Sequence, residues 1–350
     1  MDLVILFMAL VVILFGAELF TNGIEWFGRK LDLAEGAVGS VLAAVGTALP
    51  ETMIPLIAII FGGGGGGGSH EVGVGAILGA PFMLGTLAMF VTGVAILIFR
   101  RRRRQGVAVA VNQKVLLHDL RWFVLGYGLA IAAALLPPGF ELAKVGVAIA
   151  LLALYGWYVR GHLGAETGES DADLAPLRLR HLDRGRGHQP VPRLRVVGLQ
   201  VLLALGCIVV GATFFVGAVQ ALAASLGVDS ALLALVIAPI ATELPEKFNS
   251  VIWVRQGKDT LALGNITGAM VFQSAIPTSV ALIFAPAAWS IGPGSALSFL
   301  SAGIALVSLA AIFVPMRIRG ELTGRGLAIG GLFYVAYLAL VIAGISQTAS

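Results

Sequence analysis

Two stretches decide the fold: Gly-Thr-Ala-Leu-Pro-Glu at residues 46–51 and Ala-Thr-Glu-Leu-Pro-Glu at residues 241–246. Each places a threonine, a proline and a carboxylate inside a long apolar segment. A carboxylate within a bilayer costs about 2.5 kcal/mol or more, so it requires a charged partner, a water-filled cavity or an ion. Glu51 and Glu246 stand in matched contexts 195 residues apart. The pair therefore predicts a cation site built from two related halves.

The composition is that of a polytopic membrane protein. Apolar residues make up 58% of the chain and charged residues only 12%, whereas a soluble domain carries about 25% charged residues. At about 20 residues per spanning helix, 350 residues leave room for about ten helices. The single cysteine, Cys207, excludes a disulfide within the chain. We interpret the N-terminal apolar segment as a first spanning helix rather than a cleaved signal peptide.

We expect an all-α fold in which about ten transmembrane helices form two inverted repeats of five. The expected domains are a first repeat at 1–159, an arginine-rich, solvated cytoplasmic linker at 160–194 and a second repeat at 195–350. Apolar runs place the helices at 3–24, 36–61, 71–99, 120–136, 140–159, 195–224, 230–254, 260–285, 294–315 and 325–346.

Basic residues assign the two sides of the membrane. Of the 23 lysines and arginines, all but Lys144 and Lys247 lie in alternate loops. The positive-inside rule then puts these loops in the cytoplasm and both termini outside, in a bacterial inner membrane. The run Arg100–Arg104 is interpreted as a topology signal beside anionic lipid rather than a nucleic-acid patch. The expected partners are inorganic cations and the lipid bilayer, with no nucleic acid.

Two alignments within the chain indicate an internal repeat. An offset of 195 residues aligns 16–51 with 211–246, and an offset of 189 aligns 75–80 with 264–269. Each half holds five predicted helices, and an odd number reverses the orientation of the second half. Inverted repeats with broken helices near the bilayer midplane are typical of secondary transporters.

The residue types of the two stretches suit a hard cation. Pro50 and Pro245 each prevent a regular hydrogen bond to a carbonyl one turn earlier. Free carbonyls, threonine hydroxyls and glutamate carboxylates are oxygen ligands, which suit Na⁺ or Ca²⁺. Thr47 lies four residues before Glu51, and Thr242 is equally spaced from Glu246, so each pair shares one helix face.

The paired Thr-x-Leu-Pro-Glu and Gly-x-x-x-Gly-Ala segments resemble the two α-repeats of the sodium/calcium exchanger family, within the Ca²⁺/cation antiporters. The chain is similar to a divergent prokaryotic-type member. The resemblance implies alternating access by sliding of the first and sixth helices, with Ca²⁺ and Na⁺ or H⁺ as substrates and no cofactor. It implies Glu51 and Glu246 as principal calcium ligands, with Thr47 and Thr242 adding oxygen.

The chain also departs from the family pattern. The serines after the two threonines are replaced by Ala48 and Glu243, and the Asn or Asp positions of the third and eighth helices are Leu84 and Gln273. Oxygens that the family uses for sodium are therefore missing, which leaves both Na⁺ and H⁺ open as counter-ion. The expected metal ligands are Thr47, Glu51, Thr242, Glu243, Glu246 and Gln273.

Lys247 allows two hypotheses. Its ammonium replaces a bound sodium among Glu243, Glu246 and Gln273, or it forms an i,i+4 ion pair with Glu243 in a watery vestibule. Three further polar residues follow one side of the first helix and are expected to line an entry path or a helix interface: Glu18, Asn22 and Glu25. The pair His118-Asp119 is expected at the membrane interface.

The preferred function is a secondary active antiporter that exchanges Ca²⁺ for Na⁺ or H⁺. The alternative is a non-transporting scaffold or receptor with a degenerate ion site. We do not expect an enzyme, because the sequence shows no His/Asp or Ser/Lys constellation at membrane depth. The exchanged ions, their stoichiometry and the oligomeric state stay open.

Overall fold

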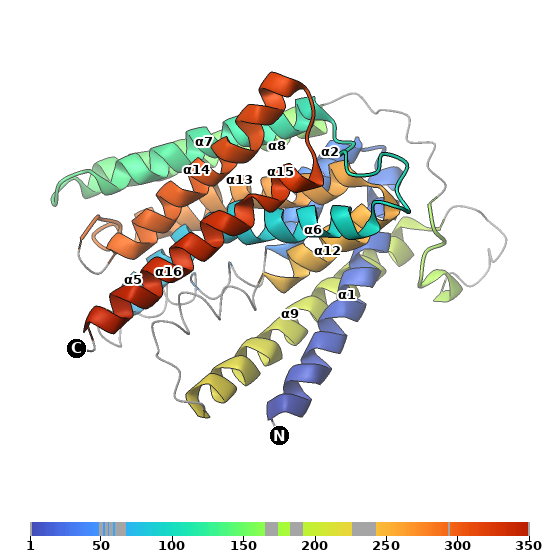
Figure 1. Ribbon diagram of the computed structural model, residues 1–350, viewed down its shortest axis with the longest axis horizontal. Coiled ribbons are helices and arrows are strands. Elements are labelled where there is room, and N and C mark those ends of the chain that lie inside the picture. Colours follow the sequence, from blue (N-terminus) through green and yellow to red (C-terminus); the bar gives the residue numbers. More distant parts are fainter. Residues whose placement is uncertain are drawn as a thin grey trace.

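The computed structural model describes residues 2–48, 52, 55, 59, 68–164, 174–182, 192–225, 243–292 and 295–348. These residues are almost entirely helical (Figure 1), and their only β feature is an isolated bridge between Ala108 and Thr323. The predicted all-α class is therefore confirmed.

The first half of the chain contributes four long helical segments and one that is described in part. The elements are α1 (Asp2–Lys30), α2 (Glu35–Ala37), η1 (Val38–Ala43), α3 (Ala44–Thr47), α5 (Gly68–Met83), η3 (Leu84–Ala88), α6 (Met89–Phe99), α7 (Gln113–Ala134) and α8 (Glu141–Leu163). Two of them, η1 and η3, are π-helical turns within longer helices.

The second half repeats this plan. Its elements are η4 (Arg180–Leu182), α9 (Leu194–Ser225), α12 (Leu244–Gln256), α13 (Asp259–Phe284), α14 (Ala296–Arg319), α15 (Gly324–Ala328) and α16 (Gly330–Thr348). Among the described residues, eight helices are long and apolar enough to cross a membrane. The predicted second and seventh helices are described in part, as α2–η1–α3 and α12, so the count agrees with about ten.

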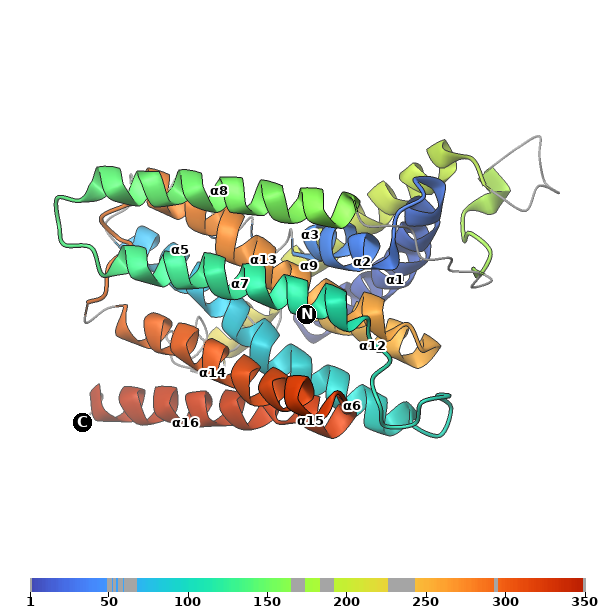
Figure 2. The same cartoon turned by 90° about the horizontal axis from the view of Figure 1, so that it is seen from above.

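Helix α13 is the centre of the molecule. It is the most buried of the candidate spans and packs on α7, α8, η1, α5 and α12, between the layers seen in Figure 2. Large apolar side chains instead cover the outward faces of peripheral helices, as at Leu142, Trp157 and Leu202. A buried central helix within an apolar periphery is what a polytopic membrane protein requires, because lipid solvates the outside.

Helices α1 and α9 form a pair beside the rest of the bundle (Figure 1). Two glycines that the repeat alignment pairs, Gly16 and Gly211, lie at the contact between these helices. A Cβ on Gly16 would lie 3.0 Å from Ile208, and one on Gly211 would lie 2.8 Å from Ile13. Small residues thus let the two helices approach closely, as is usual in membranes.

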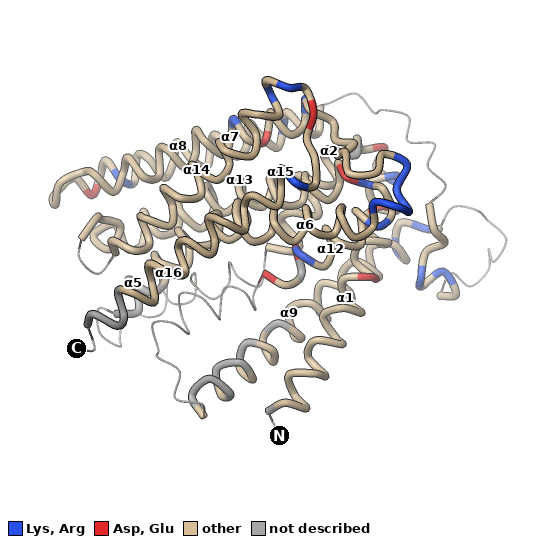
Figure 3. Tube along the Cα trace, in the orientation of Figure 1, with Lys and Arg blue, Asp and Glu red and all other residues tan. Residues whose placement is uncertain are grey.

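Most lysines and arginines of the described chain lie toward one end of the bundle, here called the basic end (Figure 3). It comprises the segments 100–104, 255–258 and 317–325. One of its arginines, Arg103, is buried and donates from Nη1 to Asp259 Oδ1 (2.7 Å) and to the Val254 carbonyl (2.9 Å). This contact fixes the loop after α6 to the turn between α12 and α13.

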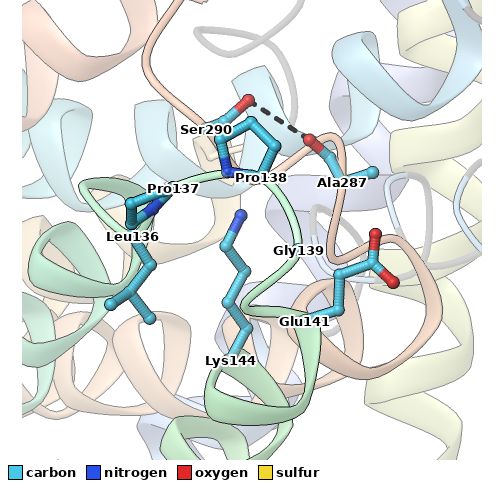
Figure 4. Close-up of a pocket in the computed structure, with 8 residues that line it drawn as sticks. All are labelled: Leu136, Pro137, Pro138, Gly139, Glu141, Lys144, Ala287 and Ser290. Carbon is cyan, nitrogen blue, oxygen red and sulfur yellow. Dashed lines mark hydrogen bonds between the residues drawn. The ribbon is translucent and has the colours of Figure 1, made fainter.

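Lys144, one of the two basic residues outside the predicted pattern, lies at the other end of the bundle. Its buried ammonium donates to the carbonyls of Pro286 and Trp289, both at 2.9 Å. It borders a cavity of about 80 Å³ between the 136–141 turn and Ala287 and Ser290 (Figure 4). The ammonium therefore joins two loops instead of marking the cytoplasmic side.

Part of the linker does not match the expected solvated segment. Leu177 is only 2% exposed and packs with Trp26, Val196 and Val197. The Ala175 carbonyl also accepts a hydrogen bond from the Trp26 indole N–H (2.9 Å). Residues 174–182 are thus attached to the α1–α9 pair. Most of the other described linker residues are exposed, and the charge composition does not reveal the Leu177 anchor.

Candidate cation site

Thr47 joins the first half of the predicted site to α13. It ends α3 and is fully buried. Its Oγ1 lies 3.1 Å from Asn265 Oδ1 and 3.0 Å from the Ala43 carbonyl. The hydroxyl therefore bridges its own helix and α13, and its oxygen lone pairs remain available as ligands.

The second half of the site begins at the start of a helix. Helix α12 starts at Leu244, with Pro245 in its first turn, and ends at Gly257 in the left-handed conformation. Proline is tolerated at a helix start because the N–H that it lacks has no intrahelical partner there. The predicted interruption of the seventh helix stays a prediction, because residues 226–242 lie outside the described residues.

Glu243 and Lys247 form a buried ion pair. Lys247 Nζ lies 2.9 Å from Glu243 Oε2, and the side chains are only 6% and 1% exposed. The predicted i,i+4 pair is therefore present, but its expected setting in a watery vestibule is wrong. Replacement of a bound sodium by this ammonium stays a prediction, which a change of ion selectivity in Lys247→Met would support and unchanged selectivity would contradict.

Glu246 lies one residue before this lysine and is also fully buried. Its carboxyl is near enough to that of Glu243 for an electrostatic interaction. One turn later, Ser250 Oγ donates to the Ala262 carbonyl (3.2 Å) of the antiparallel α13. At 1.5 Å per residue, Glu246 is therefore roughly level with residues 265–270 of α13, the region in which Asn265 meets Thr47.

The remaining predicted ligands are distributed as follows. Gln273 is buried in α13, about 12 Å along the helix from Asn265 by its rise per residue. Glu51 and Thr242 lie outside the described residues, so their positions stay predictions. The structure thus brings Thr47 and Glu246 to one level and sets Gln273 farther along.

Two asparagines add unsatisfied polar atoms to this region. Both amide atoms of Asn249 and the Nδ2 of Asn265 are buried without a hydrogen-bond partner among the described residues. Buried polar groups are nearly always paired with protein, water or an ion. The orphaned amides therefore indicate that the crossing of α12 and α13 holds a polar occupant.

The polar residues of α1 lie at interfaces. Glu25 pairs with Lys258 and accepts from the Trp253 indole N–H (2.9 Å). Asn22 donates to the Ala175 carbonyl (3.2 Å), and Glu18 pairs with Arg178 (2.6 Å). Of the two expectations for these side chains, interface placement is the one that their contacts support.

Asp119 is the polar residue for which the predicted helix boundary was wrong. It is fully buried in the protein and contacts His162 at 2.8 Å, while its predicted place at the membrane interface stays a prediction. A His/Asp pair therefore does lie inside a membrane-spanning bundle. The error arose from the helix boundary: α7 begins at Gln113, where the Asn112 side chain accepts from two backbone N–H groups, not at 120. A carboxylate six residues inside a spanning helix would have been flagged.

Known proteins resemble this chain over most of its length. The sodium/calcium exchanger protein family matches residues 1–162 and 197–343. The chain belongs to the sodium/calcium exchanger family. CaxA of Alkalimonas amylolytica, described as a putative antiporter, is 27% identical to this chain over 287 residues, which are 79% of each protein. An uncharacterized membrane protein of Methanocaldococcus jannaschii is 42% identical over 57 residues, 16% of this chain and 19% of that protein.

Solved structures of an exchanger share the fold. The sodium-calcium exchanger NCX_Mj, soaked with Na⁺ and Ca²⁺, superposes with a TM-score of 0.70 at 14% identity over 97% of both chains. The same exchanger without Na⁺ and Ca²⁺ gives a TM-score of 0.69 at 16% identity, over 97% of this chain and 98% of that one. The described helices of this exchanger-family chain therefore have the architecture of NCX_Mj.

Proposed function

We propose that the chain is a secondary active antiporter that exchanges Ca²⁺ for Na⁺ or H⁺ at a site formed by Glu51 and Glu246. The observation that carries the proposal is the position of buried Glu246, level with the contact between Thr47 and Asn265. Carboxylate, hydroxyl and amide oxygens of the described residues thus lie at one level of the bundle, and oxygen atoms are the ligands that hard cations prefer.

The charges around this site fit a divalent cation. Glu243 and Lys247 neutralise one another within their ion pair. Glu51 and Glu246 then supply two negative charges, which one Ca²⁺ or two monovalent cations would balance. Matched charge is needed because uncompensated charge at membrane depth is costly. The buried Oδ1 of Asn249, which has no hydrogen-bond partner among the described residues, supports the same occupant because an amide oxygen can coordinate a cation.

The α1–α9 pair is suited to the moving part of such a transporter. Helix α1 packs chiefly on α9 and less on α12 and η1. Alternating access by rocking or sliding one bundle past a fixed site is the usual mechanism of inverted-repeat transporters. In this proposal, residues 1–159 and 195–350 are the two repeats, and the docked part of the linker moves with the pair.

The orientation in the membrane belongs to the same proposal. The basic end would face the cytoplasm of a bacterial inner membrane, with both termini outside. Lys144, the exception at the opposite end, is held by two carbonyls and does not oppose this assignment.

The test is cation flux in proteoliposomes that contain the full chain. Glu246→Gln is expected to reduce exchange of radioactive Ca²⁺ to the level of protein-free vesicles, because the amide cannot balance a cation. Glu321→Gln, an exposed glutamate at the basic end, is the matched control and should retain wild-type flux. Wild-type-like flux in Glu246→Gln would refute the site.

The same experiment separates transporter from scaffold. A scaffold with a degenerate site would show no flux of Ca²⁺, Na⁺ or H⁺ in the wild type, with or without stabilisation by these ions. Flux in the wild type that requires a counter-ion gradient would establish exchange and identify the second ion.

A further inference from the structure

A second buried polar cluster surrounds Asp119, apart from the proposed cation site. Asp119 Oδ2 accepts from Ser40 Oγ (2.7 Å) and Thr267 Oγ1 (2.6 Å). Asp119 Oδ1 lies 3.1 Å from the Tyr158 hydroxyl and 2.8 Å from His162 Nε2. The four partners come from η1, α13 and α8, and all are at most 4% exposed. One carboxyl group thus connects four helical elements.

Two of the hydroxyls have a second acceptor already in place. The Tyr158 hydroxyl is 3.1 Å from the Ser40 carbonyl, and Thr267 Oγ1 is 3.0 Å from the Leu263 carbonyl. A hydroxyl has one hydrogen to donate. It can therefore point to Asp119 when the carboxyl is ionised and turn to the carbonyl when a proton is bound. When the Thr267 hydroxyl turns in this way, its bond to α7 is replaced by a bond within α13.

Histidines connect this cluster to the basic end. His162 lies in the last turn of α8, and the rings of His118 and His162 are 5.0 Å apart. Buried His118 Nε2 has no hydrogen-bond partner among the described residues. A Cβ on Gly161 would lie 3.2 Å from His118 Nε2, so a side chain at position 161 would crowd the His118 ring. Histidine exchanges protons near neutral pH, so the pair is suited to pass protons to Asp119.

No fixed cation neutralises Asp119 in the described part of the chain. The charged or titratable neighbours of the cluster are His118 and Arg121 on α7, and Tyr155, Tyr158 and His162 on α8. Helix α13 contributes no charge except Asp259, which is paired with Arg103. Glu35 of α2 lies outside the described side chains. The described residues also contain no group of three His, Cys, Asp or Glu suited to a metal ion.

The cluster lies on the contact that positions the cation site. Ser40 precedes Thr47 by two helical turns, and Thr267 follows Asn265 by two residues. Between them, η1 and α13 touch so closely that a Cβ on Gly268 would lie 2.0 Å from the Ser40 carbonyl oxygen. Any change of charge at Asp119 therefore acts on the packing of the two helices that hold Thr47 and Asn265.

We propose that Asp119 and His162 form a proton-binding site through which the pH at the basic end controls the packing of η1 on α13. The carboxyl of Asp119 takes up one proton from water and donates it in a hydrogen bond to neutral His162, so the net charge of the pair changes from minus one to zero. The hydroxyls of Tyr158 and Thr267 then turn to their carbonyl acceptors. The residues of this site are different from those of the proposed cation site.

The first experiment measures proton binding without transport. Infrared difference spectra of the purified full chain are recorded during pH titration, with carboxyl and imidazole bands as readout. Asp119→Asn is expected to lose one titrating group, and His162→Gln to shift the remaining midpoint, because coupled groups titrate as a pair. His181→Gln, an exposed histidine in η4, is the control. Titrations of Asp119→Asn and His162→Gln that match the wild type would overturn the site.

The second experiment rests on the proposed function. The rate of Ca²⁺ exchange is measured against pH on the basic-end side of proteoliposomes, with the other side fixed. The wild type and His181→Gln should share one profile, which His162→Gln and Tyr158→Phe flatten. Unchanged profiles in both variants would refute the coupling. Absence of flux in the wild type would refute antiport, while the infrared titration would still decide the proton site.

Discussion

The two π-helical turns of the first repeat, η1 and η3, have similar backbone hydrogen bonds and helix contacts but differ in the side chains around them. Each leaves a carbonyl that accepts a hydroxyl from another helix: Ser40 accepts from Tyr158 at 3.1 Å, and Gly85 accepts from Ser308 at 2.8 Å. Each is also approached by a glycine. A Cβ on Gly268 would lie 2.0 Å from η1, and one on Gly330 would lie 2.5 Å from the Thr86 carbonyl of η3.

The surroundings of the two turns are unequal. At η1 the donating tyrosine also reaches Asp119, which contacts His162. At η3 the hydroxyl of Ser308 is accompanied by apolar side chains: a Cβ on Gly85 would meet Met270 and Leu309 at 3.3 and 3.5 Å. π-Helical turns often mark functional sites. In our proposal, the carboxyl and imidazole beside η1 make that turn the one that responds to protons.

The largest effect is expected from crowding the closer glycine contact. Gly268→Ala places a Cβ on a backbone oxygen of a second helix, which cannot turn away as a side chain does. We expect a loss of about 3 kcal/mol or more in stability, at the upper end for overpacking, seen as a lower thermal unfolding temperature in detergent. Gly330→Ala at η3 should cost less, about 1 to 3 kcal/mol, because the approach is 0.5 Å looser.

The control for both is Gly128→Ala, at an exposed position of α7 where a Cβ meets nothing within 4 Å among the described residues. It should leave the unfolding temperature unchanged or raise it slightly. Equal losses in Gly268→Ala and Gly330→Ala would show that the two turns are packed alike and would weaken the comparison.

A smaller effect separates the turns chemically. Tyr158→Phe and Ser308→Ala each remove one hydroxyl, at a cost of about 1 kcal/mol for a neutral hydrogen bond. The proposed proton site predicts that the cost of Tyr158→Phe rises with pH, because its hydroxyl donates to Asp119 when the carboxyl is ionised and charge-assisted bonds are about twice as strong. The cost of Ser308→Ala should not vary with pH, because its acceptor is a carbonyl.

Thermal unfolding of both variants across pH checks this contrast. Parallel pH profiles for Tyr158→Phe and Ser308→Ala would mean that Asp119 does not change its charge in the folded protein. That outcome would remove the chemical distinction between η1 and η3 and leave only their packing to compare.

The fold class and several site residues could be predicted from the sequence, because their signals are local. Glu246 and Pro245 could be singled out because a carboxylate and a helix breaker are conspicuous in an apolar run. The all-helical class followed from the length and apolarity of those runs. The Gly-x-x-x-Gly segment of α13 was found by internal alignment, and its Gly268 does make the closest helix contact. Each of these signals lies within a few consecutive residues.

The tertiary structure decided what depends on distant partners. Asp119 meets Ser40, Tyr158, His162 and Thr267, which lie 39 to 148 residues away. None of these residues has a local pattern that predicts the others, and Asp119 itself stood outside the expected helix. Likewise, the attachment of Leu177 to the α1–α9 pair was hidden by a charged linker composition. The sequence by itself determined which segments enter the membrane, because that depends on local hydropathy. Only the packing of the helices determined which polar side chains contact Asp119, because that depends on which helix faces lie against one another.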